Sequence, residues 1–328
     1  MRNRLLIALQ LTALPMLPCA SYGQAEGTFT MPNSTLLFET TEISSTKVPF
    51  QELVVVSTGG SVVVRSPAGF FGEDYNTVFP ALAPGADRVA WGLSKHDDSP
   101  RRRINAVLGV YSLLDKSWKT FGEFCSDGVG SIVFSPDGKR VAFASQSAFS
   151  SGNGYCFNNP IVLQILDIAT GELTPIPYPG RLSENARLSW SPDGKYLAGE
   201  FCCSASSISQ IVVIDIASGS GKVLAEGTDP SWSPKGDWIA YVDHVDKKKQ
   251  KCTLIHPDGT GAKVVQQLIG YWMFLKGAVW SPGGEKLIFN EEEVDGGANV
   301  TMLDLSSGKA TTRSKNVLFV LGWAAERH

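Results

Sequence analysis

Few side chains in the sequence have the types and spacing that chemistry requires. His96 precedes two aspartates, and His244 is the other histidine that we expect on a loop. Imidazole nitrogens and carboxylate oxygens are common metal ligands, so His96 and His244 are the candidates for a metal site. Two scattered histidines are more simply solvated loop residues. We therefore predict no metal and no cofactor.

Nucleophilic hydrolysis has no support in the sequence. No G-x-S-x-G motif occurs, so the exposed serine of a nucleophile elbow is not predicted. The stretch Ser218–Lys222 is similar to the end of a phosphate-binding loop, but Ile216 occupies the place of its first glycine. This stretch is better interpreted as a turn. We predict no catalytic residues.

The charges of the chain are balanced. Its 328 residues include 29 Lys and Arg and 32 Asp and Glu, a net charge of -3. A nucleic-acid surface or an electrostatic membrane patch needs an excess of positive charge, so neither partner is predicted. The 33 glycines and 18 prolines indicate many turns.

The N-terminus has the pattern of an export signal. Arg2 and Arg4 precede an uncharged, mostly apolar run from Leu5 to Leu17, which small and polar residues follow. We interpret 1–25 as a signal peptide and 26–328 as the mature protein. The apolar run is too short to span a bilayer, so no transmembrane anchor is predicted after cleavage. The expected location is periplasmic or secreted.

Two details of this signal stay open. Cleavage after Gly23 or after Ala25 fits the small-residue rule equally well. Cys19 could carry a lipid, but Pro18 stands where lipoprotein signals have Gly or Ala, which favours simple cleavage.

Export would expose the cysteines to an oxidising compartment, in which disulfides persist. Five cysteines remain in the mature chain, none with C-x-x-C spacing: Cys125, Cys156, Cys202, Cys203 and Cys252. We expect Cys125 to pair with Cys156, and Cys202 or Cys203 to pair with Cys252. The odd number leaves at least one thiol over.

A repeat organises most of the chain. Its pattern is an apolar residue, an aromatic one, Ser-Pro-x-Gly and then alternating apolar residues. Clear copies begin at Ile132, Leu188, Pro230 and Ala278, and weaker copies begin at Ala81 and Gly322. Pro and Gly favour a tight turn between two short strands, so each copy predicts a β-hairpin. Alternating apolar strands around a second glycine-containing turn follow each hairpin. Four antiparallel strands per repeat are typical of a propeller blade.

The two ends of the chain complement each other. The sixth copy provides one strand near Trp323, and three strands are predicted at Ser34–Thr40, Glu52–Thr58 and Ser61–Ser66. We therefore predict an all-β, six-bladed β-propeller that is closed by N-terminal strands pairing with the C-terminal strand. The expected blade cores lie near 78–124, 129–179, 186–227, 229–269, 277–314, and 317–328 together with 34–67.

The repeated W/F-S-P-D-G-K hairpin, followed by an apolar strand with the ending D-h-x-T/S-G (h is apolar), resembles the propeller of TolB-type proteins. The resemblance covers most of residues 34–328 and implies a WD-repeat-like propeller. Such propellers serve as binding scaffolds and as enzyme domains, so it implies no particular activity. TolB's separate N-terminal α/β domain has no counterpart here, and its Tol-Pal role is not implied. Some TolB-like propellers are metal-dependent lyases.

The two faces of the predicted propeller differ. The turns within the A-B and C-D strand pairs are short and uniform, which defines a turn face. The connections between strands B and C are long and varied, which defines a loop face: Ser94–Arg103, Gln146–Pro160, Phe201–Ser209, Asp243–Lys251 and Glu291–Ala298. Variable loops on a rigid scaffold are common binding surfaces.

Residues that enter strand A should line the mouth of the central channel on the loop face. The candidates for ligand contact are Asp127, Asn185, Asp229 and Lys276. The recurring tryptophans of strand A are predicted to be core residues instead.

These observations predict an exported, non-catalytic binding or scaffold protein that acts through its loop face. A mixed-sign surface favours a protein partner in the cell envelope, and the chain is expected to be a monomer. The alternative is a metal-assisted lyase or hydrolase that acts on a sugar or a peptide at the channel mouth.

Overall fold

The computed structural model of the protein describes part of the chain. The described residues are 35–41, 52–57, 60–65, 70–72, 80–94, 105–147, 161–178, 187–202, 209–246, 249–269, 276–292, 298–315 and 319–325. Every regular element among them is a β-strand, so the fold is all-β in this part of the chain. A search of the same residues for an apolar helix of membrane-spanning length found none.

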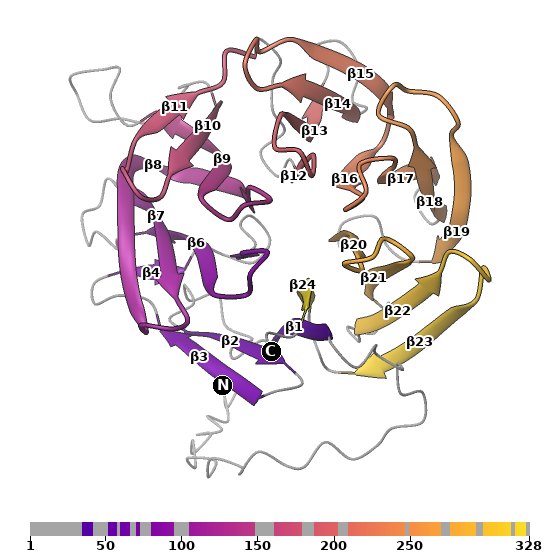
Figure 1. Ribbon diagram of the computed structural model, residues 1–328, viewed down its shortest axis with the longest axis horizontal. Coiled ribbons are helices and arrows are strands. Elements are labelled where there is room, and N and C mark those ends of the chain that lie inside the picture. Colours follow the sequence, from indigo (N-terminus) through magenta and orange to yellow (C-terminus); the bar gives the residue numbers. More distant parts are fainter. Residues whose placement is uncertain are drawn as a thin grey trace, which may run out of the picture.

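The strands form antiparallel sheets arranged around a common axis (Figure 1). The N-C sheet contains β24 (Phe319–Ala325), β1 (Thr35–Thr41), β2 (Glu52–Ser57) and β3 (Gly60–Arg65). Sheet three contains β12 (Leu188–Trp190), β13 (Tyr196–Cys202), β14 (Ser209–Asp215) and β15 (Gly221–Glu226). Sheet four contains β16 (Thr228–Trp232), β17 (Ile239–Asp246), β18 (Lys249–Ile255) and β19 (Lys263–Ile269). Sheet five contains β20 (Lys276–Trp280), β21 (Lys286–Glu292), β22 (Ala298–Asp304) and β23 (Ala310–Lys315).

The remaining sheet, here called the double sheet, is larger. It contains β4 (Phe71–Gly72), β5 (Ala81–Leu82), β6 (Arg88–Ser94), β7 (Asn105–Ser112), β8 (Ser117–Phe134), β9 (Arg140–Ser147), β10 (Ile161–Asp167) and β11 (Leu173–Pro175). Both β4 and β5 pair with β6, so two short strands occupy the inner edge where the sequence predicts a single strand.

The strand β8 is longer than the sequence indicated. The gap between the expected blade cores 78–124 and 129–179 predicts a loop at 125–128, which includes Cys125 and Asp127, but both residues lie within this 18-residue strand. It pairs with β7 through its first half and with β9 through its second half. The register shifts twice along β9, and Ser131 adopts a left-handed φ of 56°, so bulges turn the strand where a loop was predicted.

Strands from the two ends of the sequence lie side by side. β1 pairs with β24 in antiparallel register, with Leu37 opposite Trp323. The indole N–H of Trp118 in β8 donates a 2.7 Å hydrogen bond to the carbonyl of Arg65 at the end of β3. The N-C sheet is thus joined to the double sheet on one side.

The Ser-Pro-x-Gly segments form the predicted turns. The Ser135 hydroxyl donates to the Asp137 carboxylate at 2.6 Å, and that carboxylate accepts the Lys139 amide at 3.0 Å. These bonds hold the pKa of Asp137 below its ordinary value. Gly138 has a φ of 67°, which glycine adopts without a steric penalty. Asp137 is therefore a turn residue, as predicted.

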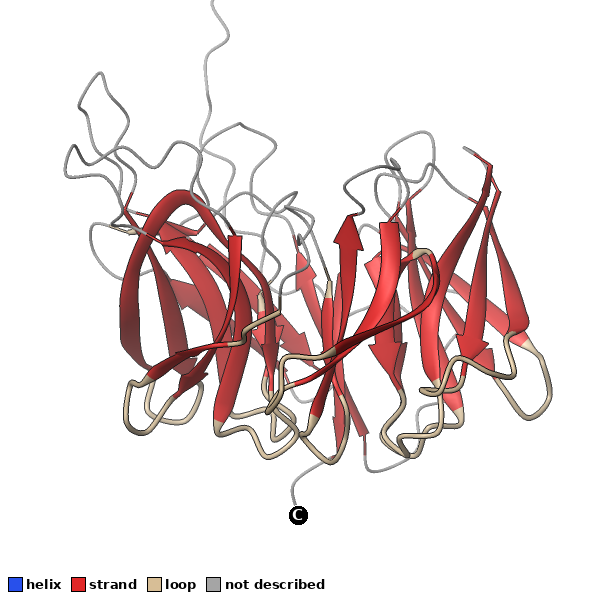
Figure 2. Ribbon diagram, turned by 90° about the horizontal axis from the view of Figure 1, so that it is seen from above, coloured by secondary structure: helices blue, strands red, loops and turns tan. Residues whose placement is uncertain are grey.

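The described turns lie along one edge of the molecule (Figure 2). This edge is the turn face, and β6 and β9 end at the opposite edge. One predicted loop is wrong, because β17 continues to Asp246 and β18 begins at Lys249. Pairing of His244 with Gln250 carries the hairpin through the expected loop Asp243–Lys251. Charged residues are frequent in loops, but no Gly or Pro interrupts this segment, and strand pairing continues through it.

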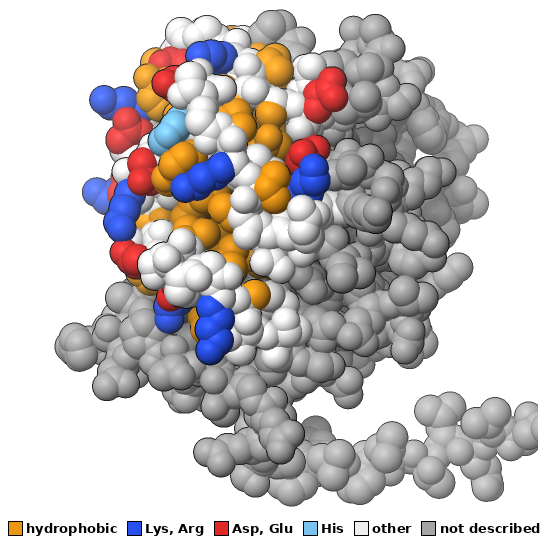
Figure 3. Space-filling view, turned by 90° about the vertical axis from the view of Figure 1, so that its right-hand side faces the viewer, with side chains coloured by type: hydrophobic (Ala, Val, Ile, Leu, Met, Phe, Trp, Pro, Cys, Tyr) orange, Lys and Arg blue, Asp and Glu red, His pale blue; other side chains and the backbone are white. Residues whose placement is uncertain are grey.

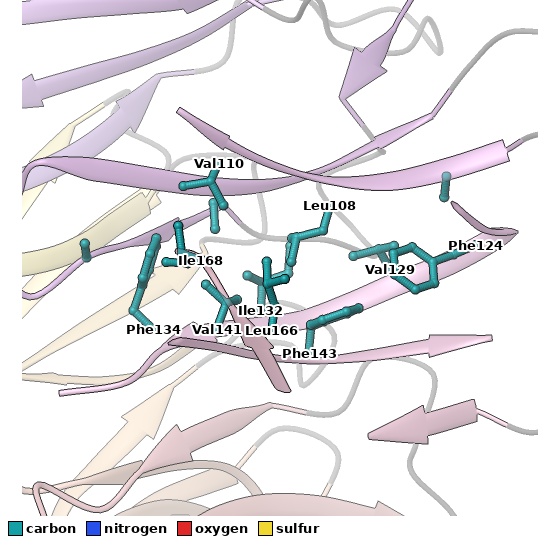
Figure 4. Packing of buried hydrophobic residues seen from close by; sticks show 13 residues of the cluster. Leu108, Val110, Phe124, Val129, Ile132, Phe134, Val141, Phe143, Leu166 and Ile168 are labelled. Atoms are coloured by element: carbon teal, nitrogen blue, oxygen red, sulfur yellow. The ribbon is translucent and has the colours of Figure 1, made fainter. Parts of the chain in front are cut away.

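The core consists of apolar layers between neighbouring sheets and inside the double sheet. Figure 4 shows the layer inside the double sheet, in which Leu166 lies between Phe134 and Phe143. Equivalent layers lie between the double sheet and sheet three, between sheets three and four, and between sheets four and five. The burial of apolar side chains thus joins the sheets side by side.

The tryptophans of the innermost strands belong to these layers. Trp190, Trp232 and Trp280 are each less than one tenth exposed, which confirms the prediction that they are core residues. The indole N–H of Trp190 donates to the carbonyl of Val133 at 3.2 Å, and that of Trp280 donates to Ser231 at 3.0 Å. The buried Trp232 Nε1 has no hydrogen-bond partner. Two of the three repeat-equivalent indoles therefore link neighbouring sheets.

A close backbone contact also joins the double sheet to sheet three. Gly219 has a φ of 69°, and a Cβ atom there would lie 2.7 Å from the carbonyl oxygen of Pro177. Gly308 occupies a similar turn of sheet five with a φ of 67°, but a Cβ atom there would meet nothing within 4 Å. The contact at Gly219 thus depends on the absence of a side chain.

Candidate functional site

Asp229 is the one predicted ligand-contact residue whose side chain the structure describes. It lies in β16, one of the innermost strands, near the end that is opposite the turn face. The register between β16 and β17 shifts between Thr228 and Ser231, and Asp229 takes a left-handed φ of 56°. Aspartate tolerates this conformation better than most residues, and Pro230 has no amide hydrogen to offer the strand. A bulge therefore holds the Asp229 carboxylate in place.

The partner of Asp229 comes from the neighbouring inner strand. Arg187 directly precedes β12, and its Nε lies 3.2 Å from Asp229 Oδ1. The two residues are repeat equivalents, since each stands five positions before the proline of its Ser-Pro turn. The Arg187 side chain is 27% exposed and that of Asp229 is 13% exposed, so the ion pair is only partly open to solvent. It connects sheets three and four.

Glu200 adds a second carboxyl group. It lies in β13 and is 9% exposed. Its amide donates to the Arg187 carbonyl at 3.1 Å, and its Oε1 accepts a 2.8 Å hydrogen bond from the Ser209 hydroxyl. The backbone amide of Asp229 also donates to the Glu200 carboxyl group. We call Arg187, Glu200, Ser209 and Asp229 the mouth quartet.

Burial dominates the electrostatics of the mouth quartet. The pKa of Glu200 is raised to about 7, mainly because the carboxyl group is removed from water and secondly because of the negative charge of Asp229. The hydrogen bonds from the Ser209 hydroxyl and the Asp229 amide and the charge of Arg187 oppose this rise and are already included in that value. Burial also lowers the pKa of Arg187, against the pull of both carboxylates. Near neutral pH, Glu200 therefore exchanges between its protonated and ionised forms.

This arrangement is suited to binding polar or charged groups. It offers a guanidinium, two carboxyl groups and a hydroxyl group in surroundings of low exposure, where electrostatic interactions are stronger than in water. A buried carboxyl group with a pKa near 7, here Glu200, beside a residue with a strained backbone, here Asp229, is a feature of functional sites.

The sequence interpretation missed three members of the mouth quartet. Arg187 could have been found, because it occupies the repeat position of Asp229 with the opposite charge. Glu200 could also have been found, since two of its repeat equivalents, Ala144 and Val242, are apolar and buried, and the third, Asn290, is uncharged. A carboxyl group at a buried strand position indicates that neighbouring polar groups bind it there. Ser209 carries no comparable signal.

The other predicted site residues are placed less completely. Asn185 and His96 lie outside the described residues. Asp127 lies in β8, His244 in β17, and Lys276 begins β20, and for these three the structure describes the backbone only. Their roles stay predictions. Within the described part of the chain, no group of three or more His, Cys, Asp or Glu side chains is arranged to hold a metal ion.

Cys252 corrects one predicted disulfide. Its thiol is free and buried in the layer between sheets four and five, and burial raises its pKa. Ile255 of the same strand faces sheet three instead. Because side chains alternate along a strand, Cys252 points away from sheet three, whose strand β13 ends at Cys202. The predicted bridge from Cys202 or Cys203 to Cys252 is therefore wrong. Cys156 and Cys203 lie outside the described residues.

The outer surface carries charges of both signs. Figure 3 shows lysine, arginine, aspartate and glutamate side chains around exposed apolar ones on one side of the molecule. Val223 of β15 is 53% exposed, and Val264 of β19 is 48% exposed. No single sign of charge dominates this side, in agreement with the net charge of -3.

Comparisons with known proteins identify the fold. No protein-family model and no curated protein sequence matches the chain. Among solved structures, TolB from Acinetobacter baumannii has a TM-score of 0.64 at 17% identity, over 89% of this chain and 66% of that one. A putative TolB from Agrobacterium tumefaciens has a TM-score of 0.59 at 16% identity, over 89% and 97%. Oligogalacturonate lyase in complex with manganese has a TM-score of 0.52 at 14% identity, over 89% and 75%.

These similarities define a class. The chain has a TolB-like β-propeller fold, as its repeated hairpins predicted. It spans about two thirds of the Acinetobacter protein. At such identities the likeness concerns the fold alone, and neither a TolB activity nor a lyase reaction follows from it.

Proposed function

We propose that the protein is an exported, non-catalytic β-propeller that binds a protein partner in the cell envelope through its loop face. In this proposal, residues 1–25 are the signal peptide and 26–328 form one propeller of six blades. The double sheet provides two blades, and the N-C sheet is the blade that closes the ring. Pairing of β1 with β24 supports closure, and the division of β8 between β7 and β9 supports two blades in the double sheet.

The mouth quartet is the observation that carries the proposal. Arg187 and Asp229 form an ion pair between two inner strands, at the end that is opposite the turn face. Buried charges are costly unless the protein gains something from them, and Glu200 is kept at this place although ionisation there is disfavoured. Every member of the mouth quartet can pair with a charge or form a hydrogen bond, as the Arg187–Asp229 ion pair and the Ser209–Glu200 hydrogen bond do within it. Binding is therefore the activity that fits best.

The location and the disulfides are further parts of the proposal. The export pattern after Arg2 and Arg4 supports a periplasmic or secreted location, and the TolB-like fold is compatible with it. In that compartment, a bridge between Cys125 and Cys156 would join β8 to the segment before β10. Mass mapping of non-reduced peptides tests this bridge, and two free thiols would rule it out.

Affinity capture tests the proposed function. The purified mature chain serves as bait in an envelope extract of the source organism, beside an Asp229→Asn variant and an Asp258→Asn control on the turn face. We expect one stoichiometric partner that the wild type and the control retain and that Asp229→Asn loses.

Two results would overturn the proposal. One is a partner that is lost with the control but kept by the Asp229 variant, which would place binding on the turn face. The other is stoichiometric metal in the purified protein together with cleavage of a sugar or a peptide, which would favour the metal-assisted lyase or hydrolase.

A further inference from the structure

The charges of the mouth quartet do not balance when all its groups are ionised. Arg187 contributes one positive charge, and Asp229 and Glu200 contribute two negative ones. Among the described residues, the charged groups that act on Glu200 are Arg187, from the segment before β12, and Asp229, from β16. β14 contributes only the neutral hydroxyl of Ser209. Taken by themselves, these four residues therefore carry a net charge of about -1 when all are ionised.

The geometry shows where this negative charge lies. Arg187 Nε is engaged by Asp229 Oδ1 at 3.2 Å, so its charge is already shared. Glu200 Oε1 accepts a hydrogen bond from Ser209, and Glu200 is held by its backbone bond to Arg187. These contacts fix the carboxyl group without neutralising it. The partial exposure of Arg187 and Asp229 leaves the quartet open to a group from outside.

Building on the proposed function, we propose that the mouth quartet receives a cationic side chain of the partner, a guanidinium or an ammonium group, beside Glu200 and Asp229. Its arrival displaces the proton of Glu200 to solvent. Two positive groups then face two carboxylates, and the quartet becomes neutral. Because the site is largely withdrawn from water, each of these attractions is stronger than at an exposed surface.

An anionic ligand fits the site less well. A carboxylate that approached Arg187 would add a third negative group where two already compete for one guanidinium. A neutral ligand would leave the proton on Glu200. The charge count therefore favours a cation over both other classes.

Proton release gives the proposal a quantitative signature. Below the pKa of Glu200, about 7, a bound cation must expel the proton, so its affinity rises about tenfold for each unit of increasing pH. Above that pKa the carboxylate is already formed, and the affinity becomes independent of pH.

The test uses N-acetylarginine methylamide as the probe and its neutral isostere N-acetylcitrulline methylamide as the control. Dissociation constants are measured at pH 5, 6 and 8 from the amide NMR shifts of Ser209 and Asp229. We expect the constant of the arginine probe to fall about tenfold from pH 5 to 6 and about tenfold again from pH 6 to 8. The citrulline probe is expected to bind much more weakly and without this slope.

Variants connect the slope to Glu200. Glu200→Gln, with folding verified by circular dichroism, should bind the arginine probe with no pH dependence between 5 and 8. Glu226→Gln changes an exposed carboxyl group on β15, which is separated from the Glu200 strand by β14, and should keep the wild-type slope. A measurement on the wild type alone supports the same conclusion, since an unbuffered titration at pH 6 should release nearly one proton for each bound probe.

Three results would overturn this inference: equal binding of the two probes, arginine binding by the wild type without a pH slope, or no binding at any soluble concentration of the probe. If affinity capture still depends on Asp229 in these cases, the proposed function stands and only the cationic ligand is wrong. If capture is also independent of Asp229, both proposals fail.

Discussion

Substitution of Glu200 by glutamine tests the electrostatics of the mouth quartet through folding stability. The pKa of Glu200 rises from the ordinary 4.5 to about 7 in the folded protein. A carboxyl group whose pKa is raised on folding favours the folded state when it is protonated. Its favourable contribution is complete below pH 4.5 and is lost as pH rises to about 7.

The size of the effect follows from this difference. About 1.4 kcal/mol for each unit of pKa gives a penalty of about 3 kcal/mol at pH 8 for the ionised form, and about 1 kcal/mol at pH 5. Glutamine has nearly the same shape, keeps an oxygen for the Ser209 hydroxyl and carries no charge. Glu200→Gln should therefore raise the free energy of unfolding by up to about 3 kcal/mol at pH 8 and by about 1 kcal/mol at pH 5.

Urea unfolding of the wild type and the variant at both pH values is the assay. The control is Glu226→Gln on strand β15, where we expect the same small change at both pH values because Glu226 is exposed. A gain from Glu200→Gln that is equal at pH 5 and pH 8, or a loss of stability at pH 8, would refute the reasoning. Either result would mean that Glu200 is ionised without penalty.

Three further predictions concern the joints between sheets. Trp280→Phe removes the hydrogen bond from the indole to Ser231, whereas the indole nitrogen of Trp232 has no partner to lose. In urea unfolding, Trp280→Phe should therefore lower the free energy of unfolding by about 1 kcal/mol more than Trp232→Phe does. Equal losses in the two variants would contradict this prediction. Gly219→Ala should lower the free energy of unfolding by more than about 2 kcal/mol, because its new methyl group meets a backbone carbonyl. Gly308→Ala should lower it by about 1 kcal/mol, from the left-handed φ alone. Thermal unfolding compares the two glycine variants, and a reversed order would show that the close contact is not strained. Because its thiol is buried, Cys252 should resist alkylation in the folded protein and react once urea unfolds it. Peptide mass mapping measures the labelling, and a labelled Cys252 in the folded protein would contradict the prediction.

The sequence was informative about the repeated parts of the fold. Ser-Pro-x-Gly turns and alternating apolar residues are local signals, so the hairpins around Pro136 and Pro192 were predictable from short segments. The strand β8 was not, because its bulges depend on pairing with both β7 and β9. The hairpin of β17 and β18 was mistaken for a loop, since its charged residues suggested solvent while strand pairing decided the outcome.

The candidate site was predictable only in part. Asp229 could be predicted because the repeat pattern alone places it at the entry to strand A. Glu200 acts through burial and through contacts with Arg187 and Ser209, which come from other segments of the chain. The position of Glu200 in the sequence predicts neither how exposed its side chain is nor how far it lies from Arg187 and Ser209. The face of β18 to which Cys252 belongs likewise depends on how sheet four packs against sheet five.

The continuity of β8 has a consequence for local opening of the molecule. One uninterrupted backbone is hydrogen-bonded to β7 and to β9, so neither neighbour can separate from it without breaking bonds in a shared strand. Among the described residues, no strand is shared between sheets three, four and five, which are separate four-stranded sheets. The amides of 105–147 should therefore behave as one cooperative unit in hydrogen exchange, while each of the other sheets can open by itself. Under mechanical load, this segment should stay together while the other sheets separate first.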